Sequence, residues 1–315
     1  MTKPSKRPLV PAGRPEDDGR VGKKARKALE AYTVAQLNEL ANALPLLAST
    51  DHEAVHRCRL AIRRLRSVLA CYSGLVPRLP KPLRKDVRWL ATSLGEARDA
   101  HVLAQRMRLS IDAQESWESA EALYSSVGML DTTAGRAAAR LGRKKRSRRV
   151  VHAVRTSLAA GQAQKVRKAA LAYPMQEQWN RMREKLTGDA ASIDPAVRNT
   201  GLHEARKDIK RLRYAAEAVT DVFGPDATAI IQPAITLQRL LGEQHDAVVA
   251  GEWLASLSAE SGVSAQDVQF LLEVEMRRKS RAEEEFRAAA FEYPIPAPRR
   301  VLNFHAVSPD ATPAK

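Results

Sequence analysis

The chain has 315 residues, of which 44% are hydrophobic, so it is long enough to bury one large core or two ordinary ones. Lysine and arginine outnumber aspartate and glutamate by 52 to 36, which gives a formal net charge of +16. So large an excess favours a polyanionic partner: nucleic acid, an anionic membrane surface or inorganic polyphosphate. Aromatic residues make up only 5% of the chain, which argues against a surface that stacks the bases of single strands.

Two further features bear on the compartment. The two cysteines, Cys58 and Cys71, lie thirteen positions apart on one predicted helix, too far apart to form a disulfide or to share a metal ion. A reducing compartment follows, and we expect the protein in the cytoplasm. The N-terminus lacks an apolar signal region and no apolar run reaches membrane-spanning length, so we expect no membrane association.

The spacing of apolar residues predicts an all-α protein. Between residues 27 and 292, glycine and proline are sparse and apolar residues recur at steps of three and four, as on one face of a helix. Residues 1–26 and 293–315 are rich in proline, glycine or charge, and we expect a disordered basic arm and a disordered tail. The predicted helices span residues 29–48, 52–73, 81–109, 113–126, 132–160, 174–187, 195–222, 226–258 and 265–291.

Capping and helix-breaking residues mark several of these boundaries. Thr50 or Asp51 is a suitable N-cap for the second helix, and Ser264 for the last one. The segment "FGPD" after Val222 combines a glycine that can turn with a proline that cannot continue a helix. Pro233 lies inside the predicted helix 226–258, so that helix either starts later or kinks there.

The sequence repeats itself at a shift of 147 residues. The block "VHRCRLAIRRLR" (Val55–Arg66) returns as "LHEARKDIKRLR" (Leu202–Arg213), and "SLGEARDA" (Ser93–Ala100) returns as "LLGEQHDA" (Leu240–Ala247). Two separate blocks at one offset indicate an internal duplication. We therefore predict two tandem antiparallel four-helix bundles related by a pseudo-twofold axis. Their spans are residues 27–170 and 174–292.

Each basic block places a stripe of positive charge on its helix, beside the apolar stripe that faces the core. The stripes carry a single sign, whereas solvated helix faces usually interleave acidic partners one turn away. Guanidinium groups one turn apart suit a linear chain of phosphates, because each offers two parallel donors. The alternative interpretation is an ordinary solvated face. The stripe residues are His56, Arg59, Arg63 and Arg66 in the first copy, and His203, Arg206, Lys210 and Arg213, with Lys207 at the edge, in the second.

A histidine leads both stripes. His56 and His203 either contact the anion, as hydrogen-bond donors or as cations, or donate to the backbone from the edge of the core. Metal ligation is the weaker alternative, because only His52 lies one turn from His56 and it has no counterpart in the second copy. We therefore predict neither a metal ion nor a cofactor.

The "LGE..DA" blocks supply glycines and carboxylates. Gly95 and Gly242 stand in mid-helix, where glycine costs about 1 kcal/mol relative to alanine, so each indicates a close approach between helices. The carboxylates three residues apart either pair with arginines of the basic helix and hold them apart, which we favour, or act as catalytic groups or Mg²⁺ ligands. The supporting residues are Glu96, Arg98, Asp99, Glu243, His245 and Asp246, together with Arg64 and Arg211 of the basic blocks.

These blocks resemble the CHAD domain, a conserved-histidine α-helical domain. The likeness rests on the doubled H-x-x-R-x-x-x-[RK]-R-x-R and on the two "LGE..DA" blocks, and it covers roughly residues 27–292. In that family each repeat is a helical bundle, the repeats face each other, and basic residues line a central groove that binds inorganic polyphosphate. Some members carry an N-terminal CYTH triphosphatase domain, which we expect this chain to lack.

The resemblance implies that the two basic stripes line opposite sides of one basic groove. Position 60 is leucine where the second copy has Lys207, so the two sides are not equivalent. The resemblance further implies a non-enzymatic protein without catalytic residues, which binds polyphosphate at polyphosphate granules in the cytoplasm.

Three alternative functions remain open. A nucleic-acid binder is favoured by the charge and by "GRKKRSRR" (Gly142–Arg149), which we interpret as a basic helix face. A metal-dependent phosphatase would act on polyphosphate through Glu96 and Asp99. A scaffold would recruit partners through the two terminal arms.

Overall fold

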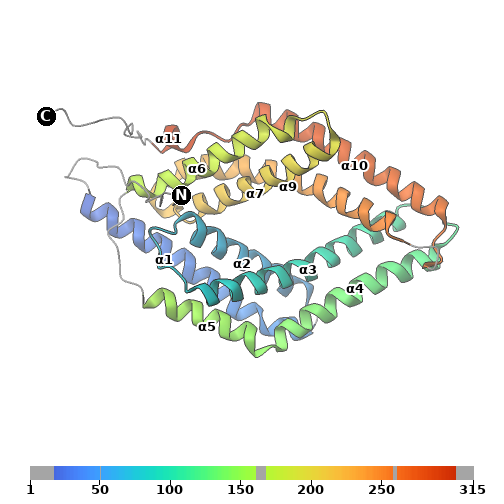
Figure 1. Ribbon diagram of the computed structural model, residues 1–315, viewed down its shortest axis with the longest axis horizontal. Coiled ribbons are helices and arrows are strands. Elements are labelled where there is room, and N and C mark those ends of the chain that lie inside the picture. Colours follow the sequence, from blue (N-terminus) through green and yellow to red (C-terminus); the bar gives the residue numbers. More distant parts are fainter. Residues whose placement is uncertain (1–17, 50, 161–167, 258–260, 303–315) are drawn as a thin grey trace, which may run out of the picture.

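In a computed structural model of the chain, all regular secondary structure is helical within the described residues, which are 18–49, 51–160, 168–257 and 261–302 (Figure 1). The all-α prediction is confirmed. None of the described helices is both long enough and apolar enough to cross a lipid bilayer. In the first half the elements are α1 (Asp18–Ala43), the 3₁₀ turn η1 (Pro45–Ser49), α2 (His52–Cys71), α3 (Lys81–Asp112), α4 (Ala120–Arg143) and α5 (Lys145–Ala159). In the second half they are α6 (Lys168–Thr187), the 3₁₀ turn η2 (Asp189–Ala191), α7 (Pro195–Glu217), α8 (Thr220–Phe223), α9 (Pro225–Ala255), α10 (Ala265–Glu292) and α11 (Pro298–Val301).

The first helix begins earlier than predicted. α1 starts at Asp18, so residues 18–26 of the expected disordered arm are helical, while residues 1–17 lie outside the described part of the chain. Ala25 and Leu29 explain the extension, because both are buried in the core and lie one turn apart on the same face.

The break between the fourth and fifth helices was predicted at the wrong place. Residues 127–131 are helical, and the chain instead turns at Lys144, whose backbone is extended. Gly142 explains the turn: a Cβ there would lie 2.8 Å from the backbone nitrogen of Ala48, so this end of α4 packs directly on η1. The hydroxyl of Ser147 donates a 2.8 Å hydrogen bond to the carbonyl of Leu141, which the broken helix leaves without its usual partner.

The second half shows three further differences at helix ends. α6 begins at Lys168 rather than at residue 174, and α7 ends at Glu217, with the short α8 completing the segment predicted to reach residue 222. α9 begins at Pro225, after Gly224 in a left-handed conformation with a φ of 52°, as glycine readily allows. Pro233 lies inside α9, so that helix does not start later.

Two predicted N-caps are confirmed. The carboxylate of Asp51 accepts hydrogen bonds from the backbone N–H groups of Glu53 and Ala54 at the start of α2. The hydroxyl of Ser264 accepts one from the N–H of Asp267 at the start of α10. Thr50, the other candidate, lies outside the described residues. The cap at Asp51 fixes the residue at which α2 begins, and with it the side of α2 on which the basic stripe lies.

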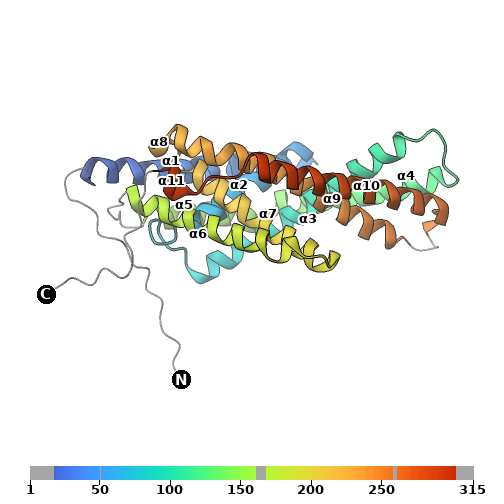
Figure 2. The same ribbon diagram turned by 90° about the horizontal axis from the view of Figure 1, so that it is seen from above.

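Apolar side chains gather in three cores. The first contains side chains from each of the helices α1, α2, α3, α4 and α5, around Leu65 and Leu94. The second contains side chains from α6, α7, α9 and α10, and also the beginning of α1 and the end of α2 with its C-cap Tyr72. The third lies where the far ends of the α3–α4 and α9–α10 hairpins meet, around Met107 and Leu254. Both views show these hairpins running to the same end of the molecule (Figures 1 and 2). The halves therefore share apolar contacts, and the division into two four-helix bundles, with the repeat boundaries given above, stays a prediction.

The C-terminal segment also differs from the prediction. Residues 293–302, part of the expected disordered tail, pack against the second core, while residues 303–315 lie outside the described chain. Ile295 and Leu302 are buried there, and the indole N–H of Trp179 donates a 2.9 Å hydrogen bond to the carbonyl of Ile295. The proline-rich composition suggested disorder, but a few well-placed apolar residues are sufficient to anchor the segment.

Replacing Ile295 with alanine should lower the free energy of unfolding by about 2–5 kcal/mol, because the side chain is only 5% exposed in the second core. Phe291→Ala, four positions earlier at a side chain that is 90% exposed, is the matched control and should change stability by less than about 0.5 kcal/mol. Urea denaturation followed by circular dichroism compares the two variants. Equal effects would show that the segment does not pack on the core.

Candidate functional site

The two helices that carry the basic stripes contact each other directly. Val68 of α2 and its C-cap residue Tyr72 lie in the same core as Ile209 and Leu212 of α7. The hydroxyl of Tyr72 donates a 2.9 Å hydrogen bond to the carbonyl of Ala215. Each basic stripe lies beside the apolar face of its helix, so this contact brings the two stripes together.

Four cationic side chains form the centre of the site. Arg59 and Arg63 come from α2, and Arg206 and Lys210 come from α7. Burial, followed by the charges of Arg63 and Arg59, lowers the pKa of Arg206. Burial, followed by the charges of Arg63, Arg206 and Arg59, lowers the pKa of Lys210 to about 6. We call these four residues the cationic cluster.

Carboxylates do not balance the cationic cluster. Asp99 pairs with Arg59 at 2.8 Å, whereas Arg63 and Lys210 form no ion pair with any residue that the structure describes. The Nε of Arg206 is buried and has no hydrogen-bond partner in the described chain. Asp246 lies nearby, but burial raises its pKa although Arg206 opposes the shift. Buried donors without acceptors are costly, so this arrangement favours an anion.

Gly95 and Gly242, the glycines of the two "LGE..DA" blocks, lie beneath arginines of the cluster. The guanidinium of Arg59 donates a 2.7 Å hydrogen bond to the carbonyl of Gly95, and a Cβ at that glycine would lie 3.1 Å from Nη1 of Arg59. A Cβ at Gly242 would lie 3.5 Å from Nη2 of Arg206. The sequence predicted a close approach between helices, but the groups accommodated are guanidinium side chains.

The two leading histidines lie at the ends of the cluster. His56 keeps an exposed side, and partial burial together with the nearby Arg98 lowers its pKa. Partial burial, followed by Lys207 and Arg206, lowers the pKa of His203. The ring of His203 lies 4.8 Å from that of His245, whose pKa falls to about 4 because of burial and Arg206. Burial and the neighbouring positive charges therefore favour the neutral form of these rings, in which each imidazole keeps one hydrogen-bond donor.

Glu217 engages part of the predicted site. Its Oε1 accepts a 2.8 Å hydrogen bond from Nε of Arg213, its Oε2 lies 3.2 Å from Nε of Arg64, and it also accepts a bond from the hydroxyl of Tyr32. Arg213 and Arg64 are thus held by a carboxylate at the edge of the cluster. Glu217 was not predicted, although its position four residues after Arg213 is a recognisable pairing signal.

Three more predicted residues lie outside the cationic cluster. Lys207 pairs with Glu204 at 2.6 Å, and Arg211 pairs with Asp208 at 2.6 Å, each across one helical turn. Arg66 is exposed, further along α2. The structure therefore concentrates unpaired positive charge in fewer residues than the sequence pattern suggested.

The supporting carboxylates divide between two roles. Asp99 pairs with the basic helix as expected, but Glu243 instead accepts a 2.7 Å hydrogen bond from Arg106 of α3. Arg106 also contacts Glu275 of α10, 169 positions away in sequence. Glu96 is exposed. Arg106 and Glu275 were not predicted, because only the folded chain brings α3 and α10 together.

Arg98 lies beside the α2 side of the cluster. Burial, followed by the charge of Arg59, lowers its pKa, while Glu53, Asp99 and Asp246 oppose the shift. Arg98 and His245 are both half-buried, and a role for them in extending the basic surface stays a prediction.

Comparison with known proteins gives one family. A family model described as the CHAD domain matches residues 31–255. Two curated proteins of Mycobacterium tuberculosis, Uncharacterized protein Rv2226 of strain H37Rv and Uncharacterized protein MT2285 of strain CDC 1551, are each 28% identical to this chain over 237 residues. The match covers 69% of this chain and 42% of each relative, so the chain spans about two fifths of their length.

Two solved structures have a similar fold. The crystal structure of the CHAD domain from the plant Ricinus communis has a TM-score of 0.69 and 24% identity, covering 86% of this chain and 93% of that one. PptA from Streptomyces chartreusis has a TM-score of 0.66 and 18% identity, covering 84% of this chain and 98% of its own. At these identities the likeness shows the fold.

Replacing Lys210 with methionine should raise the melting temperature in anion-free buffer, and the gain should be larger at pH 6 than at pH 9. The folded pKa of about 6 lies below the ordinary value of 10.5, so the unfolded chain binds the proton more tightly and the wild type gains stability as pH rises through this window. The variant lacks that gain. Thermal denaturation of both proteins at the two pH values measures the difference, and a pH-independent difference would contradict a buried, destabilised lysine.

Proposed function

Because this chain belongs to the CHAD domain family, we propose that it binds inorganic polyphosphate between α2 and α7 and performs no reaction on it. The observation that carries the proposal is the cationic cluster, which the nearby carboxylates do not neutralise. CHAD domains are linked to polyphosphate binding, and this property of the family supports the choice of anion.

Electrostatics favours an anion with several charges. Two unit charges of opposite sign 4 Å apart attract by about 4 kcal/mol at the effective dielectric of a protein surface. Nε of Arg206 has no hydrogen-bond partner in the described chain, and charge-assisted bonds from guanidinium groups to phosphate oxygens contribute about 1.5–3 kcal/mol each before ordering costs. A phosphate beside Lys210 would raise the pKa of that lysine, so binding at pH 7.5 would take up a proton.

The arrangement of the cluster suits a linear polymer. Arg59 and Arg63 stand four residues apart on α2, and Arg206 and Lys210 stand four apart on α7, so each pair spans about 6 Å along its helix. Two rows of cations can contact successive phosphates of one chain, whereas a single phosphate would satisfy only part of them. Repeated contacts also explain why the duplicated sequence preserves the stripe in both halves.

The carboxylates support a binding role rather than hydrolysis. The phosphatase alternative requires Glu96 and Asp99 to hold Mg²⁺, but Asp99 is committed to Arg59 at 2.8 Å. In the second half, Glu243 is committed to Arg106. Carboxylates that already bind guanidinium groups are poorly placed to bind a metal ion at the same oxygen atoms. We include in the proposal that the protein works in the cytoplasm at polyphosphate granules, as the family resemblance implies.

Replacing Arg63 and Lys210 together with glutamate should weaken polyphosphate binding by at least about a hundredfold, because two charge-assisted contacts are lost and two negative charges face the polymer. Fluorescence anisotropy with a labelled short-chain polyphosphate measures the affinity. Circular dichroism should show unchanged helicity.

The matched control is Arg148→Glu with Arg149→Glu, two exposed residues of α5 that produce the same change in net charge. This variant should retain most of the affinity. Equal losses in the two double variants would show that net charge, and not the cationic cluster, determines binding.

Nucleic-acid binding is a second candidate function, favoured by one surface. The residues at the α4–α5 turn and the start of α5 are largely exposed and basic, and two of them, Lys144 and Arg146, lie over the ring of Trp89. Arg146 also pairs with Asp86 at the surface. An exposed basic face binds any polyanion through its phosphates, without base recognition.

Polyphosphate should displace duplex DNA from the protein, and DNA should not displace polyphosphate at equal phosphate concentration. The reason is that a narrow pair of cation rows contacts a flexible single chain more completely than a wide, stiff duplex. A competition titration monitored by anisotropy tests this order. Displacement of polyphosphate by DNA would favour the nucleic-acid function instead.

A further inference from the structure

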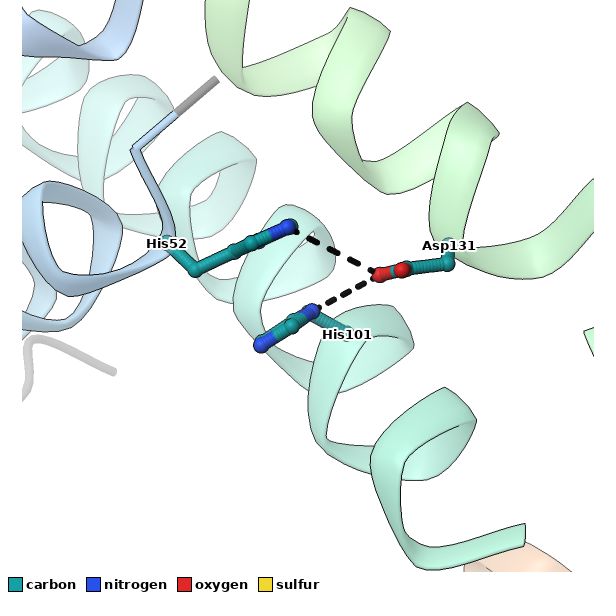
Figure 3. Close-up of side chains that lie close together, drawn as sticks. All are labelled: His52, His101 and Asp131. Carbon is teal, nitrogen blue, oxygen red and sulfur yellow. Dashed lines mark hydrogen bonds and ion pairs between the residues drawn. The ribbon is translucent and has the colours of Figure 1, made fainter. Parts of the chain in front are cut away.

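Three side chains from three helices converge at the start of α2, outside the cationic cluster. His52 is the first residue of α2, His101 lies in α3 and Asp131 lies in α4. Figure 3 shows that both imidazole rings direct a nitrogen atom toward the carboxylate of Asp131. His101 and Asp131 are 30 positions apart, and His52 lies in another segment, so the sequence alone does not reveal the group.

The distances bring the three side chains within reach of one shared ion. Their candidate ligand atoms all lie within 4.8 Å of one another. Nδ1 of His101 lies 2.7 Å, and Nε2 of His52 lies 4.0 Å, from Oδ1 of Asp131. The two rings are stacked, with centroids 3.6 Å apart and planes 10° from parallel. Stacking therefore presents two nitrogen atoms on the same side, next to one carboxylate oxygen.

We propose that His52, His101 and Asp131 bind one divalent transition-metal ion, of the class that Zn²⁺ represents. Two imidazole nitrogens and one carboxylate oxygen are a ligand set that suits zinc. Ligands at about 2.0–2.1 Å from a tetrahedral ion lie about 3.3 Å from one another. The observed separations of 2.7 Å and 4.0 Å bracket this value, so small side-chain rotations are sufficient to admit the ion.

Neighbouring residues hold the ligands in place. Nη1 of Arg108 lies 3.7 Å from Oδ2 of Asp131, so it orients the carboxylate and leaves Oδ1 to the ion. The N-cap at Asp51 fixes the first turn of α2, and with it the backbone of His52. Such outer contacts are typical of metal sites, where they orient the ligands.

The site is open to solvent on one side. The side chain of His52 is 40% exposed, while those of His101 and Asp131 are 15% and 22% exposed. Three protein ligands leave one position of a tetrahedral ion for water. The site occurs in the first half only, because the positions equivalent to His52 and His101 at the shift of 147 are Asn199 and Val248. One ion per chain is therefore expected.

Titration calorimetry of the full chain, without an affinity tag and stripped of metal by a chelator, tests the proposal with ZnCl₂ as the probe. Polyphosphate is omitted because it binds the ion itself. The wild type should bind one ion, and His101→Ala should weaken binding by about a hundredfold or more, since loss of a mere outer contact already costs about 10–100-fold. The control His152→Ala removes an exposed histidine of α5 and should bind as the wild type does.

A second variant protects the test against misfolding. His52→Ala changes a partly exposed residue at a helix start, so it decides the question alone if circular dichroism shows that His101→Ala has lost helicity. Zn²⁺ should raise the melting temperature of the wild type and of His152→Ala, but not that of His52→Ala. Absence of saturable binding by the wild type, or binding by His52→Ala that equals the wild type, would overturn the proposal.

Discussion

The cationic cluster is the constraint on which the rest of the structure depends. Arg59, Arg63 and Arg206 repel one another in a partly buried place, their charges lower the pKa of Lys210, and Asp99 offers one close counter-charge. The unbound protein must offset this repulsion through its cores. The contact of α2 with α7 supplies part of that stabilisation, because it buries apolar faces directly beside the charges. A bound polyanion would replace this repulsion with attraction. Relief of the repulsion would therefore add to the affinity for the polyanion.

The duplication explains both the regular and the irregular parts of the site. Each half places an arginine over a mid-helix glycine, Arg59 over Gly95 and Arg206 over Gly242, so the same local arrangement is built twice. The halves differ in their surroundings, since only the second has a lysine, Lys210, where the first has an arginine. Two copies that face each other create a row of charges that neither half has alone, and small differences between them leave room for separate roles.

Local features of the sequence predicted the fold class and much of the site, whereas contacts between distant segments were out of reach. The cap at Asp51 and the period of the apolar residues fixed α2 and the phase of its basic stripe. The turn at Lys144 depends on the contact of Gly142 with η1, and the Arg106–Glu275 pair joins residues 169 positions apart. Neither leaves a local pattern. The ordered segment around Ile295 was not predicted for the same reason, because its stability comes from contacts with the core that it covers.

A crystal structure of the protein with a short-chain polyphosphate tests the central claim most directly. The account predicts a chain of phosphates between α2 and α7, with phosphate oxygens within hydrogen-bond distance of Arg63, Arg206 and Lys210. Lys210 should contact a phosphate oxygen as a charged donor. Phosphates seated only on the exposed basic face of α5, with the cationic cluster unchanged, would contradict the account.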